Sequence, residues 1–372
     1  MKYYLIAGEL SGDLHAAYLI RELGKLDKDA VFRGFGGDKM AEEGCEIRKH
    51  IREMAFMGFV EVIANLKSVL GNIKVCKEDI LAFAPDVVIT IDYPGFNLRI
   101  AEWAKKHNIK VFHYISPTVW AWKKGRIKSM KRILSGLYVI LPFEKPFYAA
   151  HNFDVKYFGS PLLDEISDFR AANADKAAAE ADNKESKPMI VLMPGSRSQE
   201  IRKMLPLQLD LAAKYPQFRF VIAGVNTHTE AFYKNIIRDA DVDVRFNSTY
   251  CLLNQAQAAV VTSGTATLEA ALFGLPQVVC YKANALSIFI GRLVVKVKYI
   301  SLVNLILNRL SVTELIQGDC NKRNLEREFE RIVFDKENIK RIKADYAEIN
   351  ALLGSAGASS AIAEDIFKTL KP

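Results

Sequence analysis

The residues best suited to bind a phosphate group lie in one short stretch, where Gly195, Ser196 and Arg197 follow five apolar residues. Residues 189–193 predict a short buried strand, which the Pro-Gly pair after them ends. Ser196 and Gln199 match a capping box, which predicts that a helix begins at Ser196. The first turn of a helix offers free backbone N–H groups, and Arg197 adds a planar, permanently charged fork. The stretch therefore predicts a diphosphate cradle, although an arginine on such a turn is often only a surface charge.

A second candidate cradle follows the apolar residues 258–262. Ser263, Gly264 and Thr265 are small, so a ligand can approach the backbone, and their hydroxyl and N–H groups suit phosphate. Glu269, one helical turn further on, is placed to accept hydrogen bonds from a ribose diol, or it simply complements the helix dipole. Two cradles in the same half of the chain favour one nucleotide diphosphate bound by both.

Carboxylates follow strands in the other half of the chain. Asp92 ends an apolar run and precedes a Pro-Gly turn, where it could act as a general base. Turn and cap aspartates are more common than catalytic ones, so this alternative stays open. Glu9 and Asp13, at the end of the first strand, have the same two interpretations. The run 239–243 resembles a metal-binding Asp-x-Asp but is interpreted as solvated charge, and no metal or cofactor is predicted.

Basic and aromatic residues cluster in two places. Residues 123–132 carry six basic side chains and no acid, beside Trp120 and Trp122. Residues 282–313 also lack Asp and Glu, while basic residues interrupt a strongly apolar run. This combination suits a membrane surface or an anionic amphiphile. Nucleic acid is a rival, but no nucleic-acid motif accompanies the patches, and the apolar runs could also be core.

Length and composition set the broad class. The 372 residues favour two domains, and the net charge of +8 calls for an anionic partner if it has a role. The five cysteines are odd in number and scattered, which indicates a reducing compartment and neither disulfides nor zinc. Neither a signal peptide nor a membrane-spanning run is found. The sequence therefore predicts a cytoplasmic protein.

The chain alternates strand-like and helix-like segments. Continuous apolar strands in such a series predict parallel sheets covered on both faces, so the fold class is α/β with two Rossmann-like domains. Ligands then bind beyond the carboxyl ends of the strands. The fingerprint Gly-x-Gly-x-x-Gly is absent, which argues against a nicotinamide or flavin site. The predicted strands are 3–7, 31–35, 86–91, 110–115, 137–141, 155–158, 189–193, 218–223, 242–246, 258–262 and 277–281.

The expected domain limits follow from composition. Residues 1–167 are expected to form an N-terminal Rossmann-like domain, and the polar, alanine-rich residues 168–187 a linker or insertion. Residues 188–345 are expected to form a C-terminal Rossmann-like domain that carries both candidate cradles. Helical residues 346–372 are expected to pack back on the N-terminal domain.

Ordered motifs along the whole chain resemble the lipid-A-disaccharide synthase family of GT-B glycosyltransferases, whose two sheets face a central cleft. The motifs are 7–13, 57–62, 91–97, 113–122, 141–144, 194–197, 263–269 and 301–305. The resemblance implies an inverting enzyme that joins UDP-2,3-diacylglucosamine to 2,3-diacylglucosamine 1-phosphate (lipid X) and releases UDP. It implies that the domain 1–167 faces the acceptor and the membrane and that the domain 188–345 binds the UDP-sugar. It also implies a peripheral association with the cytoplasmic face of the inner membrane and a homodimer.

The resemblance also assigns roles to residues. Asp92 matches the family's essential aspartate, with Glu9 as a second catalytic candidate, and Arg197 matches the arginine at the UDP diphosphate. The expected donor site is Gly195, Ser196, Arg197, Ser263, Gly264, Thr265, Glu269, Asn304 and Gln317. The expected acceptor and membrane residues are Ser11, Met57, Trp120, Trp122, Lys123, Arg126, Arg292 and Lys296.

The sequence departs from the family pattern at two positions. Gly95 stands where many relatives have a second acidic residue, and Ser160 stands where they often have histidine.

Two rival functions remain. A UDP-sugar epimerase of the same two-domain plan would need no acceptor and no acid-free apolar region. A non-catalytic membrane-associated binding protein would leave both cradles and Asp92 without a role.

Overall fold

The computed structural model describes residues 1–54, 66–122, 124–173, 187–282 and 297–371. They form two compact units, Met1–Glu165 with Ser355–Pro372 (unit 1) and Ile166–Gly354 (unit 2). The chain therefore passes between the units twice. The first passage lies within α8 (Pro161–Ala172), and the second follows α17 (Lys336–Leu353). The domain limit expected at 345 falls inside α17, and residues 174–186 of the expected linker lie outside the described residues.

Unit 1 is built on a seven-stranded parallel sheet in the order β3-β2-β1-β4-β5-β6-β7. The order reverses between β1 and β4, which makes the carboxyl ends of these two strands a topological switch point, where α/β folds bind ligands. The strands are β1 (Lys2–Ala7), β2 (Val31–Gly36), β3 (Glu46–His50), β4 (Val87–Ile91), β5 (Lys110–Tyr114), β6 (Gly136–Val139) and β7 (Lys156–Tyr157).

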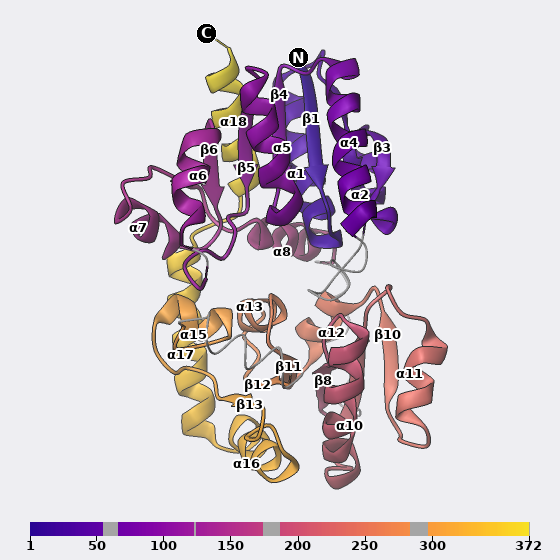
Figure 1. Ribbon diagram of the computed structural model, residues 1–372. Helices are drawn as coiled ribbons and strands as arrows, with labels where there is room; N and C mark the ends of the chain where they lie inside the picture. The colour runs from indigo at the N-terminus through magenta and orange to yellow at the C-terminus, as the bar shows by residue number, and fades with distance from the viewer. Residues whose placement is uncertain (55–65, 123, 174–186, 283–296, 372) are drawn as a thin grey trace. The chain divides into compact units, whose positions relative to one another are not determined.

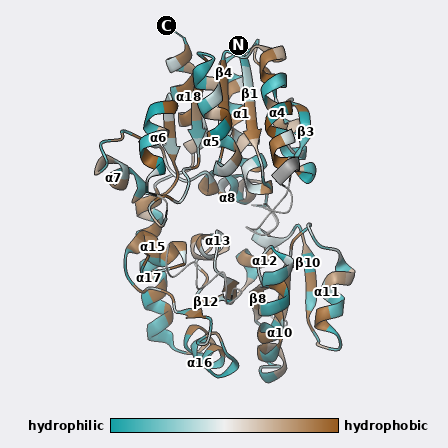
Figure 2. Cartoon of the chain, viewed as in Figure 1, coloured by the Kyte–Doolittle hydropathy of each residue, from teal (hydrophilic) through white to brown (hydrophobic). Residues whose placement is uncertain are grey.

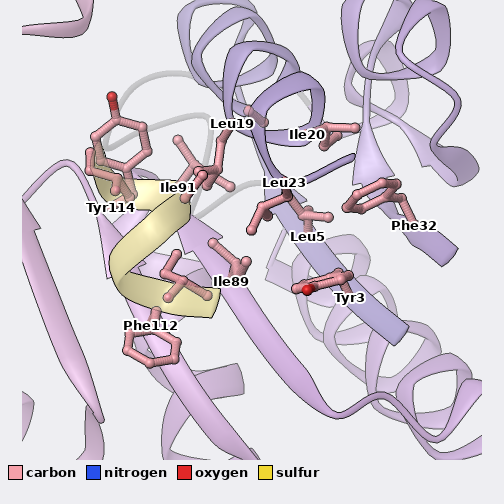
Figure 3. Packing of buried hydrophobic residues seen from close by; sticks show 14 of the residues in the cluster. Tyr3, Leu5, Leu19, Ile20, Leu23, Phe32, Ile89, Ile91, Phe112 and Tyr114 are labelled. Atoms are coloured by element: carbon pink, nitrogen blue, oxygen red, sulfur yellow. The ribbon is translucent and has the colours of Figure 1, made fainter. Parts of the chain in front are cut away.

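Helices cover both faces of this sheet because alternate residues of its central strands point to opposite faces. Tyr3 and Leu5 of β1 pack with α1 and α18, whereas Tyr4 and Ile6 pack with α4 and α5. Figure 3 shows the first of these clusters, with the C-terminal helix α18 in yellow beside Ile91. The helices are α1 (Leu10–Leu26), α2 (Asp38–Glu42), η1 (Ile51–Glu53), α4 (Leu66–Phe83), α5 (Pro94–Lys106), α6 (Arg126–Ile133), α7 (Glu144–Ala149), α8 and α18 (Ala358–Leu370).

Unit 2 repeats the same plan with a six-stranded parallel sheet in the order β10-β9-β8-β11-β12-β13. Its switch point lies between β8 and β11. The strands are β8 (Met189–Met193), β9 (Arg219–Gly224), β10 (Asp243–Phe246), β11 (Ala258–Thr262), β12 (Gln277–Tyr281) and β13 (Glu314–Ile316). The helices are α10 (Ser198–Lys214), α11 (Glu230–Ile237), α12 (Thr249–Gln255), α13 (Ala266–Leu272), α15 (Leu302–Leu307), α16 (Lys322–Val333) and α17.

The predicted fold class, α/β with two Rossmann-like parallel sheets, is confirmed. Every predicted strand is present, with ends that shift by at most two residues. Two edge strands, β3 and β13, were not predicted. Strand β3 is polar and only partly buried, and β13 has three residues, so neither produces an apolar run. Figure 2 shows the contrast between the hydrophobic strand β1 and helices such as α10, which carry both colours.

Among the residues that the structure describes, no helix is long and apolar enough to cross a membrane.

Candidate active site

Asp92 is the first residue after β4, and its backbone adopts an unusual conformation. Asp92 and Tyr93 have φ angles of 45° and 47°, in the left-handed region that residues other than glycine seldom adopt. The N–H of Asp92 donates to the carbonyl of Tyr114 at 2.9 Å, and the amide of Asn97 donates to the carbonyl of Asp92 at 2.7 Å. Strained backbone persists only where its surroundings determine it, often at functional sites. The fold therefore fixes Asp92 at the switch point of unit 1.

Glu9 lies at the neighbouring strand end, where it is the N-cap residue of α1. The preceding residue, Gly8, packs against the ring of Tyr93, and a Cβ added to Gly8 would stand 2.4 Å from that ring. Only glycine permits this approach of the turns after β1 and β4. As a result, the negative charge of Glu9 acts on the carboxyl group of Asp92.

The surroundings of Asp92 make it a suitable base at neutral pH. Burial is the main cause that raises the pKa of Asp92 to about 6, and the charge of Glu9 raises it further. The backbone N–H of Tyr93 and the nearby His15 act in the opposite direction. A carboxylate with a pKa near 6 is ionised at pH 7 and yet basic enough to accept a proton in a transition state.

Glu144 is a second buried carboxyl group, on which the charge of Asp92 acts, and the residue pattern did not predict it. Its carboxylate accepts from the indole N–H of Trp120 at 3.2 Å and from the backbone N–H groups of Ile140 and Leu141 at 3.1 and 3.0 Å. Burial raises the pKa of Glu144 to about 7 against these hydrogen bonds, and the charge of Asp92 contributes to the rise. Glu144 thus joins the loop after β5 to the end of β6. In the sequence, only the family resemblance of the motif 141–144 points to this residue.

Asp13 holds two helices of unit 1 together. Its buried carboxylate accepts from the backbone N–H groups of Gly37, Lys39 and Met40 at 2.6, 3.0 and 3.2 Å. These contacts tie α1 to the start of α2 and supply the acceptors that the N-terminus of α2 lacks. A Cβ on Gly37 would stand 2.5 Å from the carboxylate, so only glycine fits there.

We expect Asp13→Ala to lower the free energy of unfolding by about 2–4 kcal/mol, because it leaves buried N–H groups without acceptors. Denaturant titration of the intact protein measures the change. Asp38→Ala is the matched control. It removes an exposed carboxylate that pairs with Arg52, and it should cost less than about 1 kcal/mol. Equal losses for the two variants would contradict the role of Asp13.

Unit 2 holds a pocket of about 280 Å³ at the carboxyl ends of β8 and β11, its switch point. Six of the residues expected to bind the donor line it: Gly195, Ser196, Ser263, Gly264, Thr265 and Glu269. Thr262 and Thr249 also line it and were not predicted. The hydroxyl oxygen of Thr262 is buried without a hydrogen-bond partner among the described residues, which suits a polar ligand. The pocket therefore brings the two predicted cradles together.

The helix that borders this pocket begins later than predicted. The predicted capping box of Ser196 and Gln199 is wrong, since α10 starts at Ser198 and the side chain that reaches back to the N-terminus of the helix is that of Glu200. The Glu200 carboxylate accepts from the backbone N–H groups of Ser196 and Arg197, both at 3.3 Å, and from the guanidinium of Arg197 at 3.4 Å. The Glu200 carboxylate thereby occupies the N–H groups and the guanidinium that were predicted to bind a phosphate. A phosphate ligand would have to displace this carboxylate.

Three of the residues expected to bind the donor lie outside the set of described residues that line the pocket: Arg197, which directly follows Ser196, Asn304 and Gln317. The amide of Asn304 donates to Val312 O and Glu314 Oε1, and accepts from the N–H groups of Ser311 and Val312. These four bonds use its whole hydrogen-bonding capacity to hold the loop between α15 and β13. Gln317, which follows β13, has a φ of 56°, and its side-chain nitrogen is buried without a partner among the described residues.

The expected acceptor and membrane residues are placed only in part. Trp120 is half-buried, and Trp122 is 36% exposed. The guanidinium of Arg126 lies 5.6 Å from the Trp122 ring. Ser11 is exposed in the first turn of α1. Met57, Lys123, Arg292 and Lys296 lie outside the described residues.

The fold resembles that of an epimerase and of a glycosyltransferase whose structures are known. A UDP-GlcNAc 2-epimerase from Neisseria meningitidis, solved bound to UDP-GlcNAc, matches with a TM-score of 0.70 at 16% identity, covering 99% of this chain and all of the other. A kitacinnamycin glycosyltransferase matches with a TM-score of 0.62 at 14% identity, covering 100% and 99%. At such low sequence identity, the structural likeness establishes only the GT-B fold. It therefore does not favour the epimerase alternative.

Sequence comparison gives the family. The chain is 37% identical to the lipid-A-disaccharide synthase of Syntrophus aciditrophicus over 362 residues, covering 95% of this chain and 94% of the relative. It is 34% identical to that of Geobacter sulfurreducens, covering 98% and 96%. The family model for lipid-A-disaccharide synthetase matches residues 3–363. The chain therefore belongs to the lipid-A-disaccharide synthase family of glycosyltransferases.

Proposed function

We propose that this enzyme transfers the sugar of UDP-2,3-diacylglucosamine to the 6-hydroxyl group of lipid X. The products would be UDP and the β-1′,6-linked lipid A disaccharide 1-phosphate. Family membership supports the disaccharide product. The observation that carries the chemistry is Asp92, a carboxylate fixed at a switch point with a pKa raised to about 6. A hydroxyl nucleophile needs such a base.

The reaction is a single inverting displacement. The carboxylate of Asp92 takes the proton of the acceptor hydroxyl as its oxygen attacks the anomeric carbon of the donor. The bond from that carbon to the diphosphate breaks on the opposite face, and its electron pair leaves with UDP. We assign the neutralisation of the departing charge to Arg197 and the backbone N–H groups at the start of α10. We assign to Glu9 the role of raising the pKa of the base, Asp92, through its negative charge.

The donor nucleotide is assigned to the pocket of unit 2. Its small residues, Ser263 to Thr265, leave the backbone accessible, and the unpartnered hydroxyl oxygen of Thr262 supplies a polar contact. Glu269, which also lines the pocket, is assigned to the ribose. We assign Asn304 and Gln317 to support of this site through the loops around β13.

The acceptor and the membrane surface are assigned to residues around Trp120 and Trp122 in unit 1. Indole rings beside basic residues such as Arg126 suit the headgroup region of an anionic membrane. Peripheral association with the cytoplasmic face of the inner membrane would bring the enzyme to its acylated substrates. The same reasoning extends to Met57, Lys123, Arg292 and Lys296 by sequence alone.

The linkage of the product tests this assignment. Purified enzyme is incubated with both substrates in detergent micelles, and the lipid product is isolated for mass spectrometry and NMR. We expect a mass equal to the two acylated sugars with one phosphate, and a β-configured anomeric centre bonded to oxygen 6 of the acceptor. An α-configured linkage would contradict the single displacement, and a free diacylglucosamine would indicate hydrolysis.

The pKa of Asp92 predicts the acid side of the pH profile. Because the unprotonated carboxylate is the active form, kcat/KM should fall about tenfold per pH unit below a midpoint near 6. The midpoint lies near pH 6 because the pKa of Asp92 is raised; the carboxylate of an ordinary aspartate remains ionised down to about pH 4. Initial rates of UDP release at subsaturating acceptor measure the profile. A profile that stays flat down to about pH 5 would contradict the assignment.

A further inference from the structure

Glu314, the first residue of β13, is a partly buried carboxylate to which the proposed mechanism gives no role. Its Oε1 accepts from the backbone N–H of Ser301 at 2.9 Å, from the Ser301 hydroxyl at 2.8 Å and from the amide of Asn304 at 2.8 Å. Its Oε2 accepts from the backbone N–H of Ile300 at 3.0 Å. All four donors are uncharged, and Ser301 and Asn304 are fully buried. Glu314 thus fixes the turn 300–301, which leads into α15.

This turn is bonded to the wall of the pocket in unit 2 through Ser263. The Ser263 hydroxyl donates to the carbonyl of Ile300 at 2.9 Å, and the Ser263 N–H donates to the carbonyl of Cys280 on β12 at 3.1 Å. Ser263 lines the pocket. Because both of its donors bond to the protein, Ser263 shapes the pocket wall, and its position depends on that of Ile300.

A second connection between the turn and the pocket runs through Thr267 of α13. The Thr267 hydroxyl accepts from the N–H of Leu302 at 3.3 Å and donates to the carbonyl of Gly264 at 2.8 Å. Thr267 is fully buried, and Gly264 lines the pocket next to Ser263. The segment 300–302 is therefore joined to two consecutive residues of the pocket wall.

The bonds of Glu314 make this segment rigid, because hydrogen bonds to an ionised acceptor are about twice as strong as those between neutral groups. A binding site that is already ordered spends less free energy on ordering when its ligand arrives. We propose that Glu314 is a positioning residue for the donor nucleotide, which fixes the turn 300–301 and thereby holds Ser263 and Gly264 in place. This inference rests on the proposed function, because it takes the pocket of unit 2 as the UDP site.

The test is the affinity of the full chain for UDP, measured by calorimetric titration. Glu314→Gln keeps the shape of the side chain but replaces one acceptor oxygen with an NH2 group, which cannot accept from Ile300 or Ser301. The turn should loosen, and the dissociation constant of UDP should rise about tenfold. The KM for the donor should rise in proportion. At saturating donor, kcat and the KM for the acceptor should stay within about threefold of the wild-type values.

Glu328→Gln is the matched control in the same unit. The Glu328 carboxylate is also buried, and it accepts from the hydroxyl of Thr313, the residue before Glu314, at 2.9 Å. It also pairs with Arg327 and Arg331. The same exchange should therefore lower the stability of unit 2, but it should leave the dissociation constant of UDP within about twofold of the wild type.

Thr267→Val removes the second connection and keeps the shape of the side chain. It should also weaken UDP binding several-fold. Because both substitutions act on one segment, together they should weaken binding by less than the product of their separate effects.

Unchanged UDP affinity in folded Glu314→Gln would overturn the inference, as would equal weakening by Glu328→Gln or a double variant that shows the full product. If Glu314→Gln does not fold, Thr267→Val decides, and unchanged affinity there would overturn the inference. A folded wild-type protein that does not bind UDP would instead overturn the proposed function, before any variant is compared.

Discussion

Replacing Asp92 with asparagine should lower kcat for disaccharide formation by about 10²- to 10⁴-fold, the usual contribution of a general base. Asparagine has nearly the same shape and keeps the backbone bonds to Tyr114 and Asn97, but its amide cannot accept the proton of the acceptor hydroxyl. The affinity for UDP should stay unchanged, since the nucleotide is assigned to unit 2. Initial rates of UDP release and calorimetric titration with UDP measure the two quantities.

Asp86→Asn is the matched control for this substitution. Asp86 precedes β4, at the opposite end from Asp92, and its exposed carboxylate accepts from the backbone N–H of Lys2. The same exchange there should leave turnover within about twofold of the wild type, as surface substitutions usually do. Turnover near the wild-type level in Asp92→Asn would contradict the role of the base, and a loss of UDP affinity would point to misfolding.

Replacing Arg197 with alanine should weaken UDP binding by about 10- to 100-fold, the expected loss of a charge-assisted bidentate contact. The Arg197 side chain is 61% exposed beside the pocket, and its guanidinium lies 3.4 Å from the carboxylate of Glu200. The diphosphate offers it a stronger partner, whose charge grows as the bond to the sugar breaks. The loss in kcat/KM should therefore be at least as large as the loss in affinity.

Arg202→Ala provides the comparison for Arg197. Arg202 is on α10, the helix that Arg197 precedes, but its guanidinium lies 4.9 Å from the ring of Phe232. Its removal should change the dissociation constant of UDP by less than about twofold. Equal weakening by the two substitutions would mean a general electrostatic attraction instead of a contact with the diphosphate.

The central sheets could be predicted from the sequence because their strands are buried on both faces. Apolar runs such as 3–7 and 189–193 have no other stable environment, and their burial is confirmed. The edge strand β3 could not be found in this way. Its sequence, Glu46 to His50, faces solvent on alternate positions and carries charges that protect a sheet edge.

The candidate sites were predictable where they depend on strand ends, and less so where they depend on tertiary contacts. Asp92 was placed correctly after β4. The left-handed turn that holds it depends on hydrogen bonds with Asn97 and Tyr114, which no local sequence pattern predicts. Glu144 was missed as a buried acid, because only the fold shows that it meets Trp120. The capping residue was misassigned because Ser196 and Gln199 match the motif, while Glu200 competes for the same N–H groups.

The measurement that tests the central claim most directly is UDP release from UDP-2,3-diacylglucosamine, with and without lipid X, in detergent micelles that contain EDTA. Release that depends on lipid X, with a midpoint near pH 6 on the acid side, is the expected result. Release without lipid X would show a hydrolase and contradict the transfer. The absence of release by folded protein would contradict both the substrates and the base assigned here.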